Sequence, residues 1–149
     1  MKFVQSLFDS SDDIGKTLLK AYLVRRGHVI TDNENRYGID LFSEKDDKIY
    51  RWEVEMKSLR PWTNREDFEF DTVSFLRRKE KWKDELFWYV IICRETGAAL
   101  MCSSDIIFQE KYKQFLRIKT NYRQGTDIFY RVPKELCIFV PPKEFYEPE

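Results

Sequence analysis

Apolar residues recur along the N-terminal part of the chain with the period of an α-helix. In residues 12–26, Ile14, Leu18 and Tyr22 are four residues apart and predict one apolar stripe. Ser10 or Ser11 precedes this stripe as a helix-capping residue, and two arginines close the segment, where cations favour the negative end of the helix dipole. Gly27 follows directly, and we expect it to end the helix.

The period then changes to two, which predicts strands. Residues 28–31 and 37–43 each predict a strand, and a polar segment at 44–48 predicts a turn into a third strand at 49–57. The second and third strands should therefore pair as a hairpin. Side chains of a strand alternate between its faces. In the third strand one face is apolar, with Tyr50, Trp52, Val54 and Met56, and the other is charged, with Arg51, Glu53, Glu55 and Lys57.

Two further segments complete the predicted core. Residues 58–70 are polar and predict a loop, whereas residues 73–84 carry apolar side chains three or four apart and predict a helix. The nearly continuous apolar run at 86–93 predicts a strand that is buried on both faces. After a turn, residues 98–102 predict one more strand.

The C-terminal third permits two interpretations. Residues 115–120 and 127–132 favour a hairpin around 121–126, closed by Pro133. A helix across 105–116 is the alternative for its first part. Together the elements predict a single α/β domain, a sandwich around a mixed sheet, with a core at about 12–102 and a β-rich extension at about 103–149.

Composition limits the classes of function. The 149 residues suit one domain. Because 26 basic residues balance 26 acidic ones, the chain lacks the basic excess that is typical of nucleic-acid-binding proteins. A balanced total is still compatible with a local basic patch. The three cysteines are far apart in the sequence, which favours buried thiols over a disulfide or zinc framework. The N-terminal segment has no apolar signal region, and no stretch reaches the roughly 18 apolar residues of a membrane span. We therefore expect a cytoplasmic protein.

Acidic residues and a lysine gather on the predicted hairpin. Asp40 interrupts an apolar run, Gly38-Ile-Asp-Leu41, and the hairpin should bring it near Glu55. Lys57 lies two residues beyond Glu55 and therefore on the same strand face. Two carboxylates can hold Mg²⁺ or Mn²⁺, which prefer oxygen ligands, and a neighbouring ammonium can orient water or stabilise developing charge. The alternative is an ordinary solvated strand face.

This arrangement resembles the PD-(D/E)XK nuclease superfamily. Asp40 followed by Glu55-Met-Lys57 after a short hairpin is similar to its signature, and residues 15–30 resemble the opening of restriction-endonuclease-like and Holliday-junction-resolvase-like domains. The resemblance covers about residues 12–93 and departs from the pattern where Ile39 replaces a proline. It implies a three-layer sandwich whose central mixed sheet is flanked by helices.

The same resemblance implies the chemistry. The protein would be a Mg²⁺-dependent DNA endonuclease, a phosphodiesterase in which Asp40 and Glu55 bind the metal and Lys57 is the catalytic lysine. Relatives often add an acid from the first helix, for which Asp13 is the best match and Asp12 or Asp9 the alternatives, although helix capping explains these residues equally well. Glu53 is either an additional ligand or the next member of the polar row. Resolvase-like members act as dimers, which makes a homodimer one expectation.

Basic residues outside this row are candidate contacts to DNA. They come from a loop, from the predicted second helix and from the C-terminal hairpin: Arg60, Arg65, Arg78, Lys79, Lys81, Arg117 and Lys119. Solvated surface positions are the alternative interpretation.

His28 is the single histidine, which excludes Ser-His and Cys-His triads, and no glycine-rich phosphate loop is present. A non-catalytic DNA-binding or assembly subunit on the same fold is the competing function.

Overall fold

A mixed six-stranded sheet forms the centre of the molecule. The computed structural model describes residues 11–31, 41–57, 61–76, 85–119 and 124–142. The large sheet has the order β1-β2-β3-β5-β6-β9 and contains β1 (Val29–Thr31), β2 (Leu41–Lys45), β3 (Lys48–Lys57), β5 (Trp88–Cys93), β6 (Ala99–Ser103) and β9 (Ile138–Val140). Strands β3 and β5 are parallel, and the other neighbours are antiparallel.

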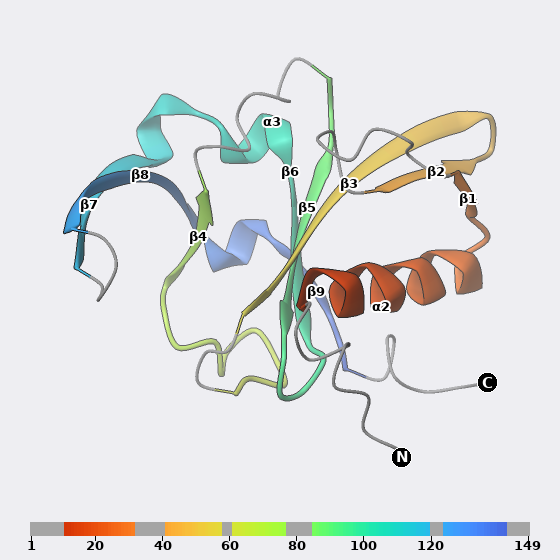
Figure 1. The fold of residues 1–149 in the computed structure, drawn as a ribbon, viewed down its shortest axis with the longest axis horizontal. Helices are drawn as coiled ribbons and strands as arrows, with labels where there is room; N and C mark the ends of the chain where they lie inside the picture. Colours follow the sequence, from red (N-terminus) through yellow and green to blue (C-terminus); the bar gives the residue numbers. More distant parts are fainter. Residues whose placement is uncertain (1–10, 32–40, 58–60, 77–84, 120–123, 143–149) are drawn as a thin grey trace.

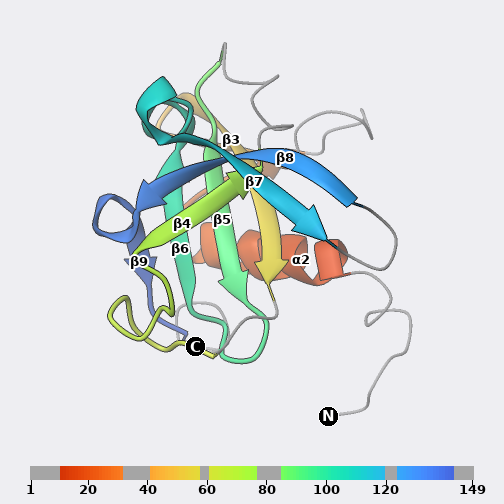
Figure 2. The ribbon, with the colours of Figure 1, turned by 90° about the vertical axis from the view of Figure 1, so that its left-hand side faces the viewer.

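The two faces of this sheet are covered differently (Figure 1). Helix α2 (Ser11–Arg25) lies across one face, where Leu19 and Leu23 pack with Trp52, Val54 and other apolar side chains. A three-stranded antiparallel sheet lies over the opposite face, in the order β4 (Thr72–Leu76), β8 (Gln124–Pro133) and β7 (Lys113–Lys119). Its strands cross those of the large sheet at a steep angle (Figure 2).

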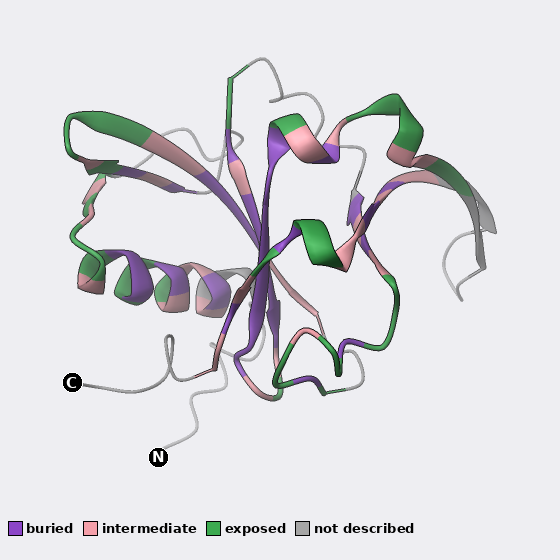
Figure 3. Cartoon of the chain, turned by 180° about the vertical axis from the view of Figure 1, so that it is seen from behind, coloured by how far each residue is buried: buried purple, intermediate pink, exposed green. Residues whose placement is uncertain are grey.

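Each interface contains its own core. Between the two sheets, Phe75, Tyr89 and Tyr130 belong to one buried cluster, and the loop before β4 adds Trp62 and Phe68. Strands β5 and β6 contribute side chains to both clusters and are buried on both faces, which the burial colouring makes visible (Figure 3). Short helical turns, α3 (Ser104–Ile107), η2 (Glu110–Tyr112) and η3 (Lys134–Leu136), connect the C-terminal strands.

The predicted hairpin and first helix are confirmed. Gly27 ends the helix with a positive φ of 89°, which glycine adopts without a steric penalty. Asp46 and Asp47 form the turn between β2 and β3 with φ values of 53° and 62°, a left-handed pair that suits the twist of a two-residue hairpin. The C-terminal hairpin of β7 and β8 is also confirmed, and the alternative helix over 105–116 is reduced to the short turns α3 and η2.

The predicted helix at 73–84 is wrong in its first part. Residues Thr72–Leu76 form strand β4, in which Val73 and Phe75 are buried and Thr72 and Ser74 are half-buried. This alternation has the strand period, and pairing with β8 satisfies the backbone. Residues 77–84 lie outside the described part of the chain. The sheet is mixed as expected, but its second cover is a small sheet, and only one helix in the described part is longer than four residues.

Gly15 is the position at which α2 comes closest to β3. A Cβ atom added there would meet Met56 Cγ and Val54 Cγ2 at 3.2 Å each. We expect Gly15→Val to lower the free energy of unfolding by about 1–3 kcal/mol, because the added methyl groups would overpack this contact. Gly15→Ala should change it less, since the gain in helix propensity of roughly 1 kcal/mol offsets the crowding.

Chemical denaturation of the three proteins would measure this effect. Lys20→Val is the matched control, because Lys20 lies on the exposed side of the same helix. If Gly15→Val is no more destabilising than Lys20→Val, the close approach of α2 to β3 does not limit the choice of residue at position 15.

Candidate functional site

Strand β3 places acidic and basic side chains in one row on the sheet face that looks toward the small sheet. Glu53, Glu55 and Lys57 alternate with Val54 and Met56, which face the helix side. The parallel neighbour β5 pairs Glu53 with Tyr89 and Glu55 with Ile91. Strand β5 therefore runs beside the whole row, whereas β2 pairs with β3 only as far as Trp52 in the described part of the chain.

Burial increases toward the middle of the row. Glu53 is 1% exposed, whereas the side chains of Glu55 and Lys57 are 27% and 22% exposed. A buried carboxylate is rare unless other groups compensate its charge. An ordinary solvated strand face would not bury its central acid, so the burial of Glu53 argues against that alternative.

Glu55 is held from two sides. The Tyr89 hydroxyl donates a hydrogen bond of 2.6 Å to Glu55 Oε2, and Lys57 Nζ lies 4.0 Å from Glu55 Oε1. Lys57 Nζ also donates to the backbone oxygen of Ser74 in β4 at 3.1 Å. Lys57 thus connects the row to the small sheet. The Glu55 carboxylate lies between Tyr89, which bonds to Oε2, and the Lys57 ammonium, which lies beside Oε1.

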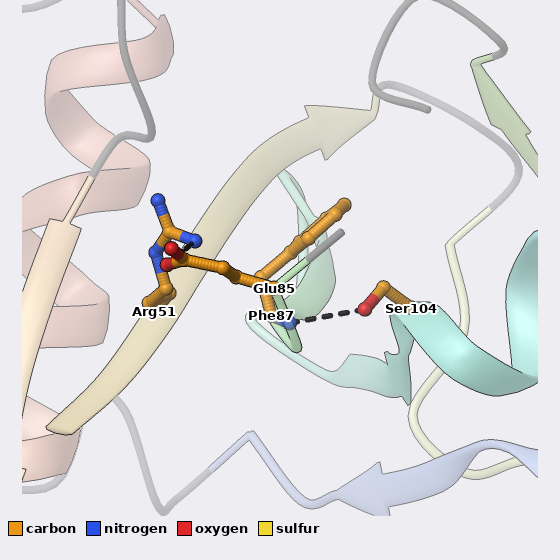
Figure 4. Close-up of polar contacts among 4 residues, drawn as sticks. All are labelled: Arg51, Glu85, Phe87 and Ser104. Atoms are coloured by element: carbon orange, nitrogen blue, oxygen red, sulfur yellow. Dashed lines mark hydrogen bonds and ion pairs between the residues drawn. The ribbon is translucent and has the colours of Figure 1, made fainter. Parts of the chain in front are cut away.

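The opposite end of the row has a structural role. Arg51 forms an ion pair with Glu85, which precedes β5 (Figure 4). The Arg51 guanidinium also lies 5.4 Å from the centre of the Phe42 ring. Nearby, the backbone nitrogen of Phe87 donates to Ser104 Oγ at 3.0 Å and ties the start of β5 to α3 (Figure 4). These contacts fix the start of β5, and hence the position of Tyr89.

The predicted site residues are brought together only in part. Glu53, Glu55 and Lys57 share one face, as expected, and Asp40 lies outside the described residues. Asp13 belongs to α2, whose backbone packs on the other face of β3, and its side chain is outside the described part. Within the residues that are described, no three acidic, histidine or cysteine side chains form a group that could hold a metal ion.

Most of the predicted DNA contacts fall where the structure gives no description. This applies to Arg60, Arg78, Lys79 and Lys81, and to the side chains of Arg117 and Lys119 in β7. Arg65 is the exception, and it donates to the backbone oxygen of Cys137 at 2.8 Å. That contact gives Arg65 a role in holding the C-terminal segment against the loop before β4.

All three cysteines are free and buried, as their spacing predicts. The side-chain hydrogen bond with Cys102 and burial raise the pKa of the Cys137 thiol above its ordinary value, which keeps it protonated and weakly reactive. In the part of the chain that the structure describes, no helix is long and apolar enough to cross a membrane.

Two contacts of the site were not predicted from the sequence. Tyr89 is a phenol in an otherwise apolar run, and a fully buried tyrosine hydroxyl needs a polar partner, which was an available signal. The Ser74 carbonyl gave no such signal, because residues 73–84 predicted a helix.

The comparisons with known proteins add no identification: no family model, curated protein or solved structure matches this chain. The resemblance to PD-(D/E)XK nucleases therefore stays a prediction that depends on the residues of the hairpin.

Proposed function

We propose that this chain is a Mg²⁺-dependent DNA nuclease whose site lies on the charged face of β3. The observation that carries the proposal is the pair Glu55 and Lys57, held 4.0 Å apart at the half-exposed end of a row whose next acid, Glu53, is buried. Such a row combines oxygen donors for a hard cation with a fixed ammonium.

Asp40 completes the proposed metal site. In the sequence Asp40 directly precedes Leu41, the β2 residue that pairs with Trp52 of β3. We propose that Asp40 and Glu55 are the ligands and that Glu53 supports them. A bound Mg²⁺ would lower the pKa of a coordinated water and offset negative charge on the phosphate.

The chain's own residues would supply the remaining chemistry. Tyr89 holds Oε2 of Glu55, and Oε1, which lies 4.0 Å from Lys57 Nζ, would be the oxygen that binds the cation. Lys57 Nζ has two further hydrogens besides the one given to Ser74, and these can orient a water molecule or bind a phosphate oxygen. The phosphodiester would be DNA, and endonucleolytic cleavage follows from the family resemblance.

The order of elements supports the finer fold assignment. Helix α2, the strands β1, β2 and β3, and a parallel β5 match five of the elements expected of a restriction-endonuclease-like core, and strand β4 stands where its second helix was expected to begin. We propose that the chain is a variant of the three-layer sandwich, in which the β4-β8-β7 sheet takes the place of a helical layer. A homodimer and a cytoplasmic location belong to the same proposal.

Cleavage assays on four substrates would test this function. We expect duplex, single-stranded or branched DNA, but not RNA, to be cut when Mg²⁺ or Mn²⁺ is present, and cutting to stop when EDTA removes the metal. Asp40→Asn should abolish cleavage and weaken Mn²⁺ binding in calorimetry while the melting temperature stays the same. An unchanged rate in Asp40→Asn would contradict the assignment of Asp40.

A non-catalytic DNA-binding or assembly subunit is the second candidate. It is favoured by the described residues, which include no group of three metal-binding side chains, and by the zero net charge. Retained DNA binding with no Mn²⁺ heat signal and no cleavage of any substrate would establish this alternative.

A further inference from the structure

A hollow of about 300 Å³ opens on the helix side of the large sheet, the face opposite the charged row of β3. It lies beside the β2–β3 hairpin, and its walls include His28, Lys45, Tyr50, Trp52 and Trp88. None of these residues belongs to the proposed metal site, so the hollow needs an explanation of its own.

Three aromatic side chains of neighbouring strands line this hollow. The rings of Tyr50 and Trp52 have centres 6.3 Å apart and planes inclined by 26°, and those of Trp52 and Trp88 have centres 6.3 Å apart and planes inclined by 27°. Tyr50 and Trp52 share one face of β3, and Trp88 is the register partner of Trp52 on β5. The three rings are therefore stacked on one another. Trp52, in the middle, is 6% exposed, and the half-buried Tyr50 and Trp88 are the outer rings against which a planar heterocycle can stack.

His28 contributes a polar group beside these rings. Trp52 Nε1 donates to Ser43 Oγ at 2.9 Å, and Ser43 Oγ lies 2.9 Å from His28 Nδ1. Since Ser43 Oγ accepts from Trp52, its own hydroxyl hydrogen can be directed at His28 Nδ1. In that tautomer the imidazole hydrogen is on Nε2, which offers one N–H donor to a ligand.

The charges of the hollow favour a neutral ring over a cation. Burial and the nearby Lys45 lower the pKa of His28, so its imidazole is neutral, and one lysine stands against one acid, Asp46, in the lining. A quaternary ammonium binds best where aromatic rings are joined by excess negative charge, which this lining lacks. Lys45 can instead bind a phosphate attached to a stacked ring.

We propose that this hollow binds a nucleobase, stacked against the outer rings Tyr50 and Trp88, with His28 Nε2 donating to a ring or carbonyl acceptor and Lys45 contacting the adjoining phosphate. The base can come from a free nucleotide or from an unpaired position of single-stranded DNA. The proposal does not depend on the nuclease function, because it concerns the other face of the sheet and requires no metal ion.

Indole N–H signals in ¹H–¹⁵N spectra would report on this site directly. Adenosine monophosphate and a short single-stranded oligodeoxyadenylate are the probes, titrated without divalent metal. We expect the signals of Trp88 and Trp52 to move and that of Trp62, which is buried between the two sheets, to stay in place. A tighter oligonucleotide would identify single-stranded DNA as the source of the base, and equal affinities a free nucleotide.

Matched variants test the contribution of stacking. Trp88→Leu and Tyr50→Leu keep apolar bulk but remove the ring, and each should weaken binding about tenfold or more. Ile49→Ala is the control on the same hairpin, because Ile49 is 71% exposed and does not line the hollow. Thermal melting confirms that each variant is folded, and Tyr50→Leu keeps the test decisive if Trp88→Leu does not fold.

Three results would overturn the proposal. The first is an absence of shifts at Trp52 and Trp88 with both probes. The second is equal binding of an oligomer without bases, since phosphate contacts alone would then explain the affinity. The third is tighter binding of tetramethylammonium than of the nucleotide, which would identify a cation site.

Discussion

Replacing Lys57 by alanine should lower the rate of DNA cleavage by about 10²- to 10⁴-fold, the range typical of removing one positioned proton-transfer or charge-stabilising group. The ammonium lies 4.0 Å from Glu55 and is bonded to the Ser74 carbonyl, so it is fixed before substrate binds. Its loss should affect kcat more than KM, because the fixed charge matters most when negative charge develops. Single-turnover cleavage at saturating Mg²⁺ would measure this change.

Lys134→Ala is the matched control for this variant. Lys134 Nζ donates to the backbone oxygen of Phe68 at 3.2 Å and is also partly buried, but it is not part of the charged row. Both variants lose one ammonium–carbonyl hydrogen bond, so their effects on folding stability should be similar. If Lys57→Ala cleaves as fast as Lys134→Ala, Lys57 has a structural role and the catalytic assignment fails.

The elements that follow local rules were predictable from the sequence. The helix that ends at Gly27 and the hairpin at Asp46 and Asp47 depend on capping, turn chemistry and periodicity, which all operate within a few residues. Strand β4 was not predictable in the same way. Phe75, Leu76, Lys79 and Trp82 have helical spacing in the sequence. Pairing of Thr72–Leu76 with β8, more than 50 residues away, decides in favour of a strand there.

The candidate site shows the same division. The shared face of Glu55 and Lys57 follows from the strand period and was predictable without a partner strand. The contact from Tyr89 depends on the parallel pairing of β3 with β5, and the contact to Ser74 depends on the small sheet lying over this face. Long-range pairings of this kind leave no periodic signal in either segment.

The Tyr89 hydroxyl provides the sharpest test of how the site is organised. We expect Tyr89→Phe to lower cleavage by about 10- to 100-fold, the range found when a hydrogen bond to a metal ligand is removed. The aromatic ring, which packs edge-to-face with Phe75 at 4.9 Å, would remain, whereas Glu55 Oε2 would lose its 2.6 Å bond and the carboxylate could rotate. Tyr89 would thus be a positioning residue that acts through Glu55.

Metal dependence separates this role from simple destabilisation. A freely rotating Glu55 should bind the cation more weakly, so Tyr89→Phe should need a higher Mn²⁺ concentration for half-maximal rate and recover part of its activity when Mn²⁺ is raised. Tyr130→Phe removes an equally buried hydroxyl from the small sheet and should leave the Mn²⁺ dependence unchanged. If both variants lose activity in parallel and neither responds to Mn²⁺, the hydroxyl of Tyr89 supports the fold only. A shift confined to Tyr89→Phe would instead identify Glu55 as a residue that holds the metal.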